Sequence, residues 1–392
     1  MKKPFIYLDN ASTTPIDKDI IEIMNMFLSP EYANPSSIHT PGRNAKNALE
    51  KARIKVAQAI NALPEEIYFT GGGTEADNLA VFGSQRKNFK NHNITSTIEH
   101  KAILDPIKKL EGTGSTSTYI PVSKEGTVSI DDIKNGITTQ TTLVSIMYVN
   151  NEIGTVQPIA EIGNEINKIK KNGYPIFHTD ACQAPSYMPI DVRKLGVDMM
   201  TLNGSKIYGP KGVGALFVKK GTSITGHIIG GGQEKNIRSG TENVSAIVGF
   251  ATALERSVNE REVIVKKITE LRDYCIDELF RTIPEISLNG SRDERVANNI
   301  NISVPGVEGE SVLLSLDEEG IFASTGSACA SKNLTPSHVL LALGIDIEKA
   351  HGTIRFTLGK HTKKEDIDFL MSVFPGIIKR LQSLSPTSIS KL

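Results

Sequence analysis

The sequence has few cysteines and no excess of charge of either sign, and each shortage excludes a class of protein. Its three cysteines, Cys182, Cys275 and Cys329, are odd in number and far apart. This spacing fits reduced thiols in a cytosolic compartment better than a disulfide framework. Because 44 Lys and Arg balance 44 Asp and Glu, no global field would draw the chain onto nucleic acid or an anionic membrane.

Long apolar runs are absent as well. No stretch is long enough to span a bilayer, and residues 1–10 have two lysines but no apolar core of signal-peptide length. We therefore expect no membrane segment and a cytoplasmic location. The composition, with 39% hydrophobic and 22% charged residues, 33 Gly and 18 Pro, is typical of a soluble globular enzyme.

Apolar runs rich in β-branched residues alternate with helical patterns over residues 20–343. This alternation predicts an α/β fold, in which a mostly parallel sheet has helices on both faces. A length of 392 residues favours two domains. A long helix is expected over residues 245–281, with a domain boundary near Arg256. The seven expected strands cover residues 67–70, 93–97, 118–121, 143–149, 176–179, 199–202 and 214–218, and shorter helices are expected over residues 44–60, 131–136 and 160–171.

Polar residues follow four of the expected strands directly. In an open parallel sheet, ligands bind outside the carboxyl ends of the strands, so these residues are expected to converge on one site. The polar residues of the four strand ends are Gly73 and Thr74; Asn150, Asn151 and Glu152; Asp180 and Gln183; and Asn203, Ser205 and Lys206.

Two of these strand ends suggest a phosphorylated, nitrogen-containing ligand. The glycines at residues 71–73 would let backbone amides approach a phosphate at Gly73 and Thr74, although a Gly-rich turn that only begins a helix gives the same pattern. Asp180, at the end of a buried strand, would need a cation such as a pyridinium nitrogen. The alternative for Asp180 is a helix or turn cap.

Lys206 and Cys329 are the candidate reactive groups. Lys206 lies beside small residues at a strand end, where its amine can lose water and react with carbonyl groups; the alternative is a solvated surface lysine, as expected for Lys211. Cys329 lies in a run of small polar residues without helical or strand periodicity, which predicts a reactive thiol on a loop. Cys182 is expected to line the pocket, and Cys275 to lie in the core.

His100 and Arg355 complete the candidate site. His100 falls between a strand and a helix, where its ring could stack on a flat cofactor or move a proton; a helix-capping role is the alternative. Arg355 alternates with apolar residues in a strand and suits bidentate capture of a carboxylate. The alternative for Arg355 is a surface ion pair.

Together these segments closely resemble those of the cysteine desulfurases of the class V (fold type I) aminotransferase family. The resemblance covers nearly the whole chain, in order, and the combination is more specific than any single piece. It is carried by YLDNASTTP (residues 7–15), GTE (73–75), EHK (99–101), VNNEIG (149–154), Asp180 with Gln183, Lys206 before YGPKG (208–212), RSGTEN (238–243), GSAC (326–329) and IRF (354–356).

The resemblance implies a homodimer that binds pyridoxal 5'-phosphate. Residues 16–256 would form the large cofactor domain with its seven-stranded sheet, and residues 1–15 and 257–392 a smaller α+β domain that carries the loop of Cys329. The cofactor would be held by Lys206 as a Schiff base, by Asp180 at the ring nitrogen, by Gln183 and Asn151 near the ring hydroxyl, by the stacked His100, and at its phosphate by Gly73, Thr74, Asn203, Ser205 and, from the neighbouring subunit, Thr241.

The implied activity is conversion of L-cysteine to L-alanine. Arg355, with Asn151, would clamp the substrate carboxylate, and Cys329 would take the sulfur as a persulfide. Sulfur would then pass to an acceptor protein, such as an iron–sulfur scaffold or a tRNA-thiolation protein. No resident metal is expected, although Cys329 could ligate an iron–sulfur cluster transiently, and no direct contact with nucleic acid is implied.

One departure from the family pattern concerns the lysine motif. The family usually has Ser-Gly-His-Lys, whereas this chain has Asn203, Gly204, Ser205 and Lys206. Loss of a potential imidazolium charge should weaken the phosphate site, so we expect weaker cofactor retention. Two alternatives stay open: another enzyme of this fold, such as a selenocysteine lyase or an aminotransferase, and a cofactor-free scaffold protein, which would be colourless.

Overall fold

The central feature of the fold is the seven-stranded sheet that the sequence predicts. A computed structural model describes residues 3–326 and 336–384 of the chain. In this sheet β8 runs antiparallel to both of its neighbours, and the strands from β7 to β4 are parallel. Its strand order is β2 (Ile67–Thr70), β8 (Gly214–Val218), β7 (Met199–Asn203), β6 (Ile176–Asp180), β5 (Thr141–Ser145), β3 (His92–Ser96) and β4 (Thr116–Ile120).

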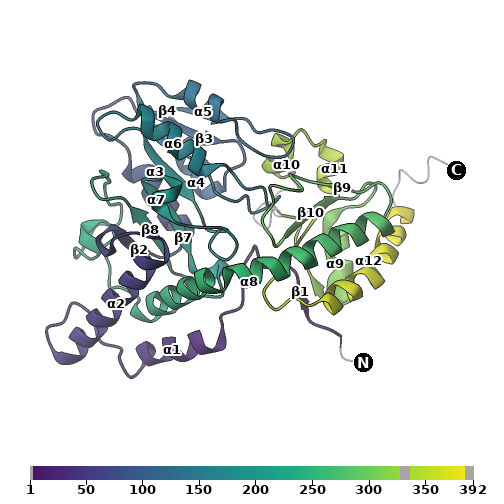
Figure 1. The fold of residues 1–392 in the computed structure, drawn as a ribbon, viewed down its shortest axis with the longest axis horizontal. Coiled ribbons are helices and arrows are strands. Elements are labelled where there is room, and N and C mark those ends of the chain that lie inside the picture. Colours follow the sequence, from purple (N-terminus) through teal and green to yellow (C-terminus); the bar gives the residue numbers. More distant parts are fainter. Residues whose placement is uncertain (1–2, 327–335, 385–392) are drawn as a thin grey trace.

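Helices cover both faces of this sheet, as expected for the fold class (Figure 1). Successive strand residues point to opposite faces, and their packing shows it: Ile176 and Met199 pack with α3 and α4, whereas Phe177 and Met200 pack in the larger core on the other side. One face is covered by α3 (Gly73–Gly83) and α4 (Lys101–Glu111), and the other by α2 (Thr40–Ala59), α5 (Ile130–Gly136), α6 (Ile159–Ile169), α7 (Val192–Leu195) and α8 (Val244–Thr282).

A second, smaller α+β part is built from both ends of the chain. Its antiparallel sheet has the order β12 (Thr353–Thr357), β10 (Asn299–Ser303) and β9 (Ser287–Leu288), and β1 (Ile6–Tyr7) pairs in parallel with β11 (Ile321–Phe322). Around these strands lie α9 (Gly309–Glu318), α10 (His338–Ala342), α11 (Ile347–His351) and α12 (Lys364–Leu384). The segment before α1 (Lys18–Leu28) joins the two parts.

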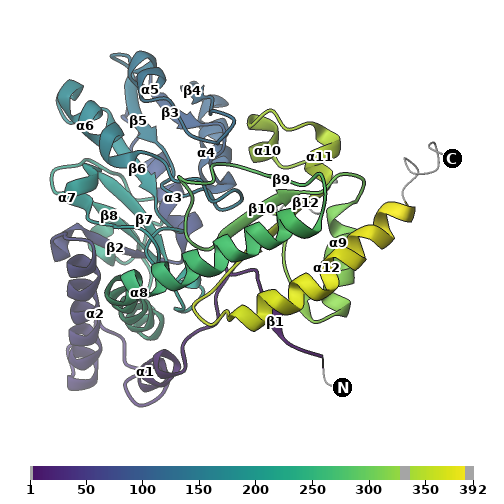
Figure 2. The same ribbon diagram turned by 45° about the vertical axis from the view of Figure 1, so that its right-hand side comes forward.

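Helix α8 connects the two parts without a break. Figure 2 shows it running from beside α2 to the small sheet. Arg256, where a domain boundary was expected, lies inside this helix and bonds to Asp17 and Asp19 near α1. The division into residues 16–256 and the remainder therefore stays a prediction. Within the described ranges, no helix is long and apolar enough to cross a membrane.

The run at residues 143–149 was expected to be one strand, and this extent is wrong. Strand β5 ends at Ser145, and Val149 instead bridges to Val156. The four residues after Ser145 are all buried, so the apolar run continues after the ladder stops. The prediction was too long because it followed the buried apolar residues, which continue past the end of the strand. Beyond β5 the chain turns towards the predicted site.

Candidate active site

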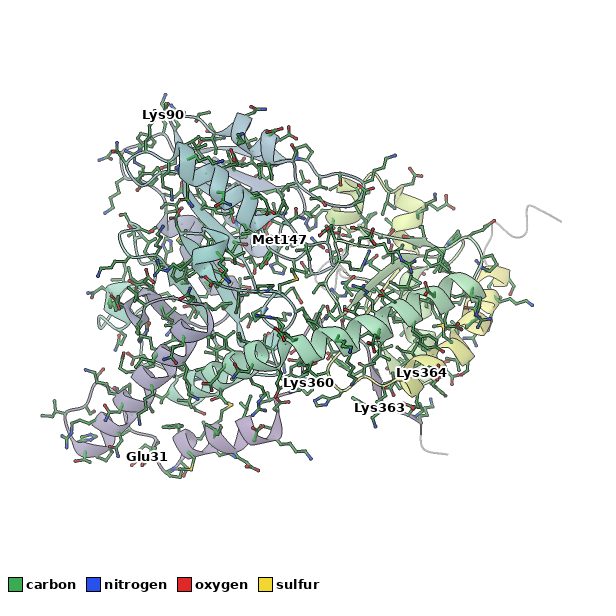
Figure 3. The ribbon with its side chains drawn as sticks, viewed as in Figure 1. Glu31, Lys90, Met147, Lys360, Lys363 and Lys364 are labelled. Carbon is green, nitrogen blue, oxygen red and sulfur yellow. The ribbon has the colours of Figure 1, made fainter. Side chains whose placement is uncertain are left out.

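The predicted strand ends meet at one cavity of about 360 Å³, which Arg355 of the three-stranded sheet also lines. Met147, one of its lining residues, lies at the junction of the two parts of the molecule in Figure 3. Of the predicted site residues, the cavity is lined by Gly73, Thr74, His100, Asn151, Asp180, Gln183, Asn203, Lys206 and Arg355.

Lys206 enters the cavity from the carboxyl end of β7. The turn of η2 (Gly204–Lys206) follows the strand directly, and the Lys206 amine donates to the backbone carbonyl of Ser12. Burial lowers the pKa of Lys206 below its ordinary value of 10.5. A larger fraction of the amine is therefore uncharged, as a nucleophile that attacks carbonyl carbon must be.

Asp180 is the last residue of β6 and is only 8% exposed. One of its carboxylate oxygens accepts a hydrogen bond from the Cys182 amide at 2.8 Å. Beneath it, Asp77 is fully buried, and this burial, with the nearby Asp180, raises the pKa of Asp77 well above 3.8. Asp77 therefore keeps its proton to a higher pH than an ordinary aspartic acid does.

His178 supports this arrangement as a neutral ring. Burial lowers the pKa of His178 to about 4. Its Nδ1 lies 2.9 Å from the Ser145 hydroxyl and its Nε2 lies 3.0 Å from the Thr201 hydroxyl. The same Nε2 lies 3.8 Å from a carboxyl oxygen of Asp77. Because His178 is neutral at neutral pH, it brings no positive charge to the Asp180 carboxylate.

Glu99, a member of the EHK motif to which no role was assigned, is a fully buried carboxyl group. The Ser96 hydroxyl donates to it at 2.6 Å and the Met147 amide at 2.9 Å, while its second oxygen has no hydrogen-bond partner in the described ranges. Burial raises the pKa of Glu99 from 4.5 to about 8. A carboxyl group of this kind costs stability when it ionises.

We expect Glu99→Gln to stabilise the protein more at pH 9 than at pH 5. The folded-state pKa lies above 4.5, so between pH 4.5 and about 8 the folded state binds more protons than the unfolded state and loses stability as pH rises. The slope is at most about 1.4 kcal/mol per pH unit. Glutamine does not ionise, so the variant does not lose this stability, and its amide oxygen can still accept from Ser96 and Met147. The difference in melting temperature between variant and wild type, measured at pH 5 and pH 9, tests this, and Glu22→Gln at an exposed position is the control. The same difference at both pH values would contradict the prediction.

His100 has the helix-capping role that was the alternative considered from the sequence, and its ring is also placed at the cavity. It is the N-cap of α4, where its Nδ1 accepts a hydrogen bond from the Ala102 amide at 3.1 Å, and its ring also lines the cavity. Because Nδ1 is an acceptor, the proton of the neutral ring lies on Nε2. The cap fixes the ring plane at the cavity wall, as a stacking group requires.

The glycine loop lies at the same edge of the sheet. Helix α3 begins at Gly73 after Gly72, whose φ is 146°. A Cβ atom at Gly73 would lie 2.7 Å from the Cys182 sulfur, so only glycine fits. The first amides of a helix have no partner within it, and here they belong to Gly73 and Thr74 beside the cavity.

Arg355 reaches the cavity from β12 and is 2% exposed. Its Nη1 donates to the carbonyls of Asn151 at 2.7 Å and Gly326 at 3.3 Å. Its Nη2 donates to an oxygen of Asp9 at 2.7 Å and to the Ser12 hydroxyl at 2.8 Å. The buried Nε has no hydrogen-bond partner among the residues that the structure describes.

The segment at residues 9–14 was not expected to touch so many of these groups. Besides Lys206 and Arg355, it contacts Gln183, whose amide donates to the Ala11 carbonyl at 2.9 Å. The Thr14 amide donates to the Ser205 carbonyl at 2.9 Å. The strand before this segment, β1, has only two residues, and the partners of the segment lie more than 170 positions away in sequence. Only its place in the family motif could therefore have indicated its importance.

Ser205 and Thr241, the other predicted cofactor residues that the structure describes, lie outside this cavity. Ser205 lines an adjoining cavity of about 990 Å³, which Gly73, Thr74 and Asn203 also border. Thr241 lines neither cavity of the single chain, and Cys329 lies outside the described residues. Cys182 lines the smaller cavity and Cys275 is fully buried, as predicted. Over residues 3–326 and 336–384, no group of three or more His, Cys, Asp or Glu side chains could hold a metal ion.

Comparison with known proteins assigns this geometry to a family. The family model described as aminotransferase class-V matches residues 6–370. The chain belongs to the class-V aminotransferase family. This membership agrees with the lysine and aspartate at adjacent strand ends, and it confirms the resemblance read from the sequence motifs.

Individual relatives within this family are similar to the chain over nearly its whole length. A protein named cysteine desulfurase IscS from Dictyoglomus turgidum is 49% identical over 385 residues, which cover 97% of this chain and 96% of that protein. A solved NifS-like protein has a TM-score of 0.89 at 34% identity and covers 96% of this chain and 100% of that one. A structure described as SspA in complex with cysteine has a TM-score of 0.79 at 35% identity, over 92% of this chain and 100% of that one.

Proposed function

We propose that this protein is a pyridoxal-phosphate-dependent cysteine desulfurase, which converts L-cysteine to L-alanine and passes the sulfur on as a persulfide of Cys329. The observation that supports this most directly is one cavity that joins the desolvated amine of Lys206, the Asp180 carboxylate and the Nε of Arg355, which has no hydrogen-bond partner within residues 3–326 and 336–384. The high identity to proteins named cysteine desulfurases supports the choice of substrate.

The residues of the cavity fit the proposed cofactor. Asp180 offers a buried anion for a ring nitrogen, and Gly73 and Thr74 line the cavity at the start of α3, where the first amides have no partner within the helix. Asn203 and Ser205 would hold the phosphate with Thr74, and Thr241 would reach that of the neighbouring subunit in a homodimer. When bound, pyridoxal phosphate supplies an electron sink that stabilises negative charge at the substrate α-carbon.

The chain's own groups then have defined tasks. Lys206 would hold the cofactor and, once released, take and return the α-proton at its Nζ; the Ser12 carbonyl would hold this amine in place. Arg355, with Asn151, would bind the α-carboxylate. His100 would cover one face of the ring. These positions would fix the substrate so that its sulfur faces the entry of an acceptor thiol.

Cys329 is the proposed sulfur acceptor, and the properties of the other cysteines support this choice. Burial raises the pKa of Cys182 well above 9.0 and that of Cys275 to about 12. Both therefore remain thiols at neutral pH, and a thiol is a poor nucleophile compared with a thiolate. From Cys329 the sulfur would pass to an iron–sulfur scaffold or a tRNA-thiolation protein in the cytoplasm.

The function is tested by supplying L-cysteine to the purified, cofactor-loaded protein in the presence of a thiol reductant. Alanine and sulfide should appear in equal amounts. Release of pyruvate and ammonia with sulfide would indicate a different lyase reaction. Transfer of the amino group to an added 2-oxo acid, without sulfide, would indicate an aminotransferase.

We expect Ser205→His to retain the cofactor more tightly than the wild type. Ser205 donates only a weak 3.3 Å bond to the Asn203 side chain, and an imidazolium at this position would add a charge-assisted hydrogen bond to phosphate. If the added hydrogen bond contributes about 1.4 kcal/mol of binding free energy, the dissociation constant of pyridoxal phosphate should fall about tenfold. Equilibrium dialysis measures this constant. Equal constants for the two proteins would show that the serine causes no weakening.

A further inference from the structure

The guanidinium of Arg355 has almost all of its hydrogen-bonding capacity in use before any ligand binds. An arginine has five N–H donors. Both terminal nitrogens are engaged, Nη1 with the carbonyls of Asn151 and Gly326 and Nη2 with Asp9 and Ser12. Only Nε is left without a partner in the described part of the chain, although it is buried. A ligand carboxylate therefore finds one free donor.

A carboxylate bound by one donor would be held weakly compared with the bidentate pairs that arginine usually forms. The two parallel N–H groups on the side of the guanidinium belong to Nε and Nη2. Nη2 is taken by Asp9 and Ser12. Bidentate capture at this edge thus requires that one of these two contacts open.

Asp9 is the contact suited to leave. Its side chain is 19% exposed, against 3% for that of Arg355, so its carboxylate can regain water when it is released. An incoming carboxylate would also place a second negative charge beside Asp9, and like charges this close repel each other. The Ser12 hydroxyl is neutral and donates to the same Asp9 oxygen at 2.7 Å, so it meets no such repulsion.

We propose that Asp9 is the resting counter-ion of Arg355 and that the α-carboxylate of the substrate displaces it from Nη2. This inference rests on the proposed function, because it takes the Arg355 subsite as the place of the substrate carboxylate. Asp9 competes with every carboxylate that enters the cavity, and it returns to Arg355 when the product leaves. It therefore weakens retention of the product at this subsite.

Asp9→Asn in the cofactor-loaded protein tests the exchange. Asparagine keeps an oxygen that can accept from Nη2 and Ser12 but removes the competing charge. The probe is propanoate, which has the carboxylate of alanine and no amino group. Its dissociation constant, obtained from the rise in melting temperature with ligand concentration, should fall about tenfold. That of the uncharged propanamide should stay the same in both proteins.

The controls separate this inference from a structural role and from the proposed function. Asp131→Asn, whose side chain is 85% exposed on α5, should leave the dissociation constant of propanoate unchanged. The KM for L-cysteine should fall in Asp9→Asn. An equal or higher dissociation constant of propanoate in Asp9→Asn, with cysteine still converted, would overturn the exchange and leave the function standing. A wild type that neither converts cysteine nor binds propanoate would overturn both.

Discussion

Replacing Lys206 with alanine is expected to lower alanine release from L-cysteine by on the order of 10⁴-fold. The variant loses the buried amine that lies in the cavity at the end of the strand next to Asp180, so the cofactor loses its covalent attachment and the α-carbon loses its base. Burial already lowers the pKa of the Lys206 amine, and no water-exposed lysine can replace that property. Alanine release under saturating pyridoxal phosphate measures the effect.

Lys90→Ala is the matched control for this prediction. Lys90 lies at the outer edge of the large part of the molecule, far from Met147 and the cavity in Figure 3, and its removal should leave the rate unchanged. Added pyridoxal phosphate should still bind to Lys206→Ala through Asp180 and the start of α3. Alanine release within about tenfold of the wild type would show that another group acts as the base, and the proposed role of Lys206 would be wrong.

Replacing Cys329 with alanine is expected to lower sulfide release by roughly 10³-fold, because covalent catalysis loses its nucleophile. Neither of the other thiols can substitute, since burial keeps the pKa of Cys182 and of Cys275 far above neutrality. The sulfide released under reductant and the mass of the persulfide formed without it both measure the loss. Cofactor binding should be unchanged, because the cavity residues that hold it remain.

Cys275→Ala is the matched control for the thiol. Cys275 is fully buried in α8, so its truncation should cost about 1 kcal/mol of stability and leave sulfide release intact. Alanine release from Cys329→Ala at the wild-type rate would contradict the persulfide mechanism. A lyase that frees sulfide directly would then be the better description.

The fold could be predicted from the sequence wherever burial makes a regular pattern. Strands β2 and β8 have the predicted bounds, and α8 differs from its prediction by one residue at each end. Lys206 and Asp180 were found because both directly follow buried strands, and a parallel sheet brings such positions together. Arg355 was identified because it interrupts an apolar strand, where a charged side chain requires a partner of opposite charge or a ligand.

Other parts of the site depend on contacts that no local pattern reveals. Asp9 and Ser12 are short polar residues near the chain start, and their link to Arg355 exists only after β12 has formed. Glu99 was visible in the motif before His100, but its raised pKa arises from burial by distant elements. Desolvation depends on how the folded chain packs around the carboxyl group. The sequence therefore indicated Glu99 but could not predict its raised pKa.

The early chain segment that lines the active site has a consequence for the order of folding. The Asn10 side chain donates to the Thr357 carbonyl at 2.8 Å, across 347 residues of sequence, and closing so long a loop is entropically slow. During synthesis Asn10 leaves the ribosome long before Thr357, on which it docks. The large sheet can fold earlier, as domains do during translation, but the substrate subsite is completed only when the last strand has joined it.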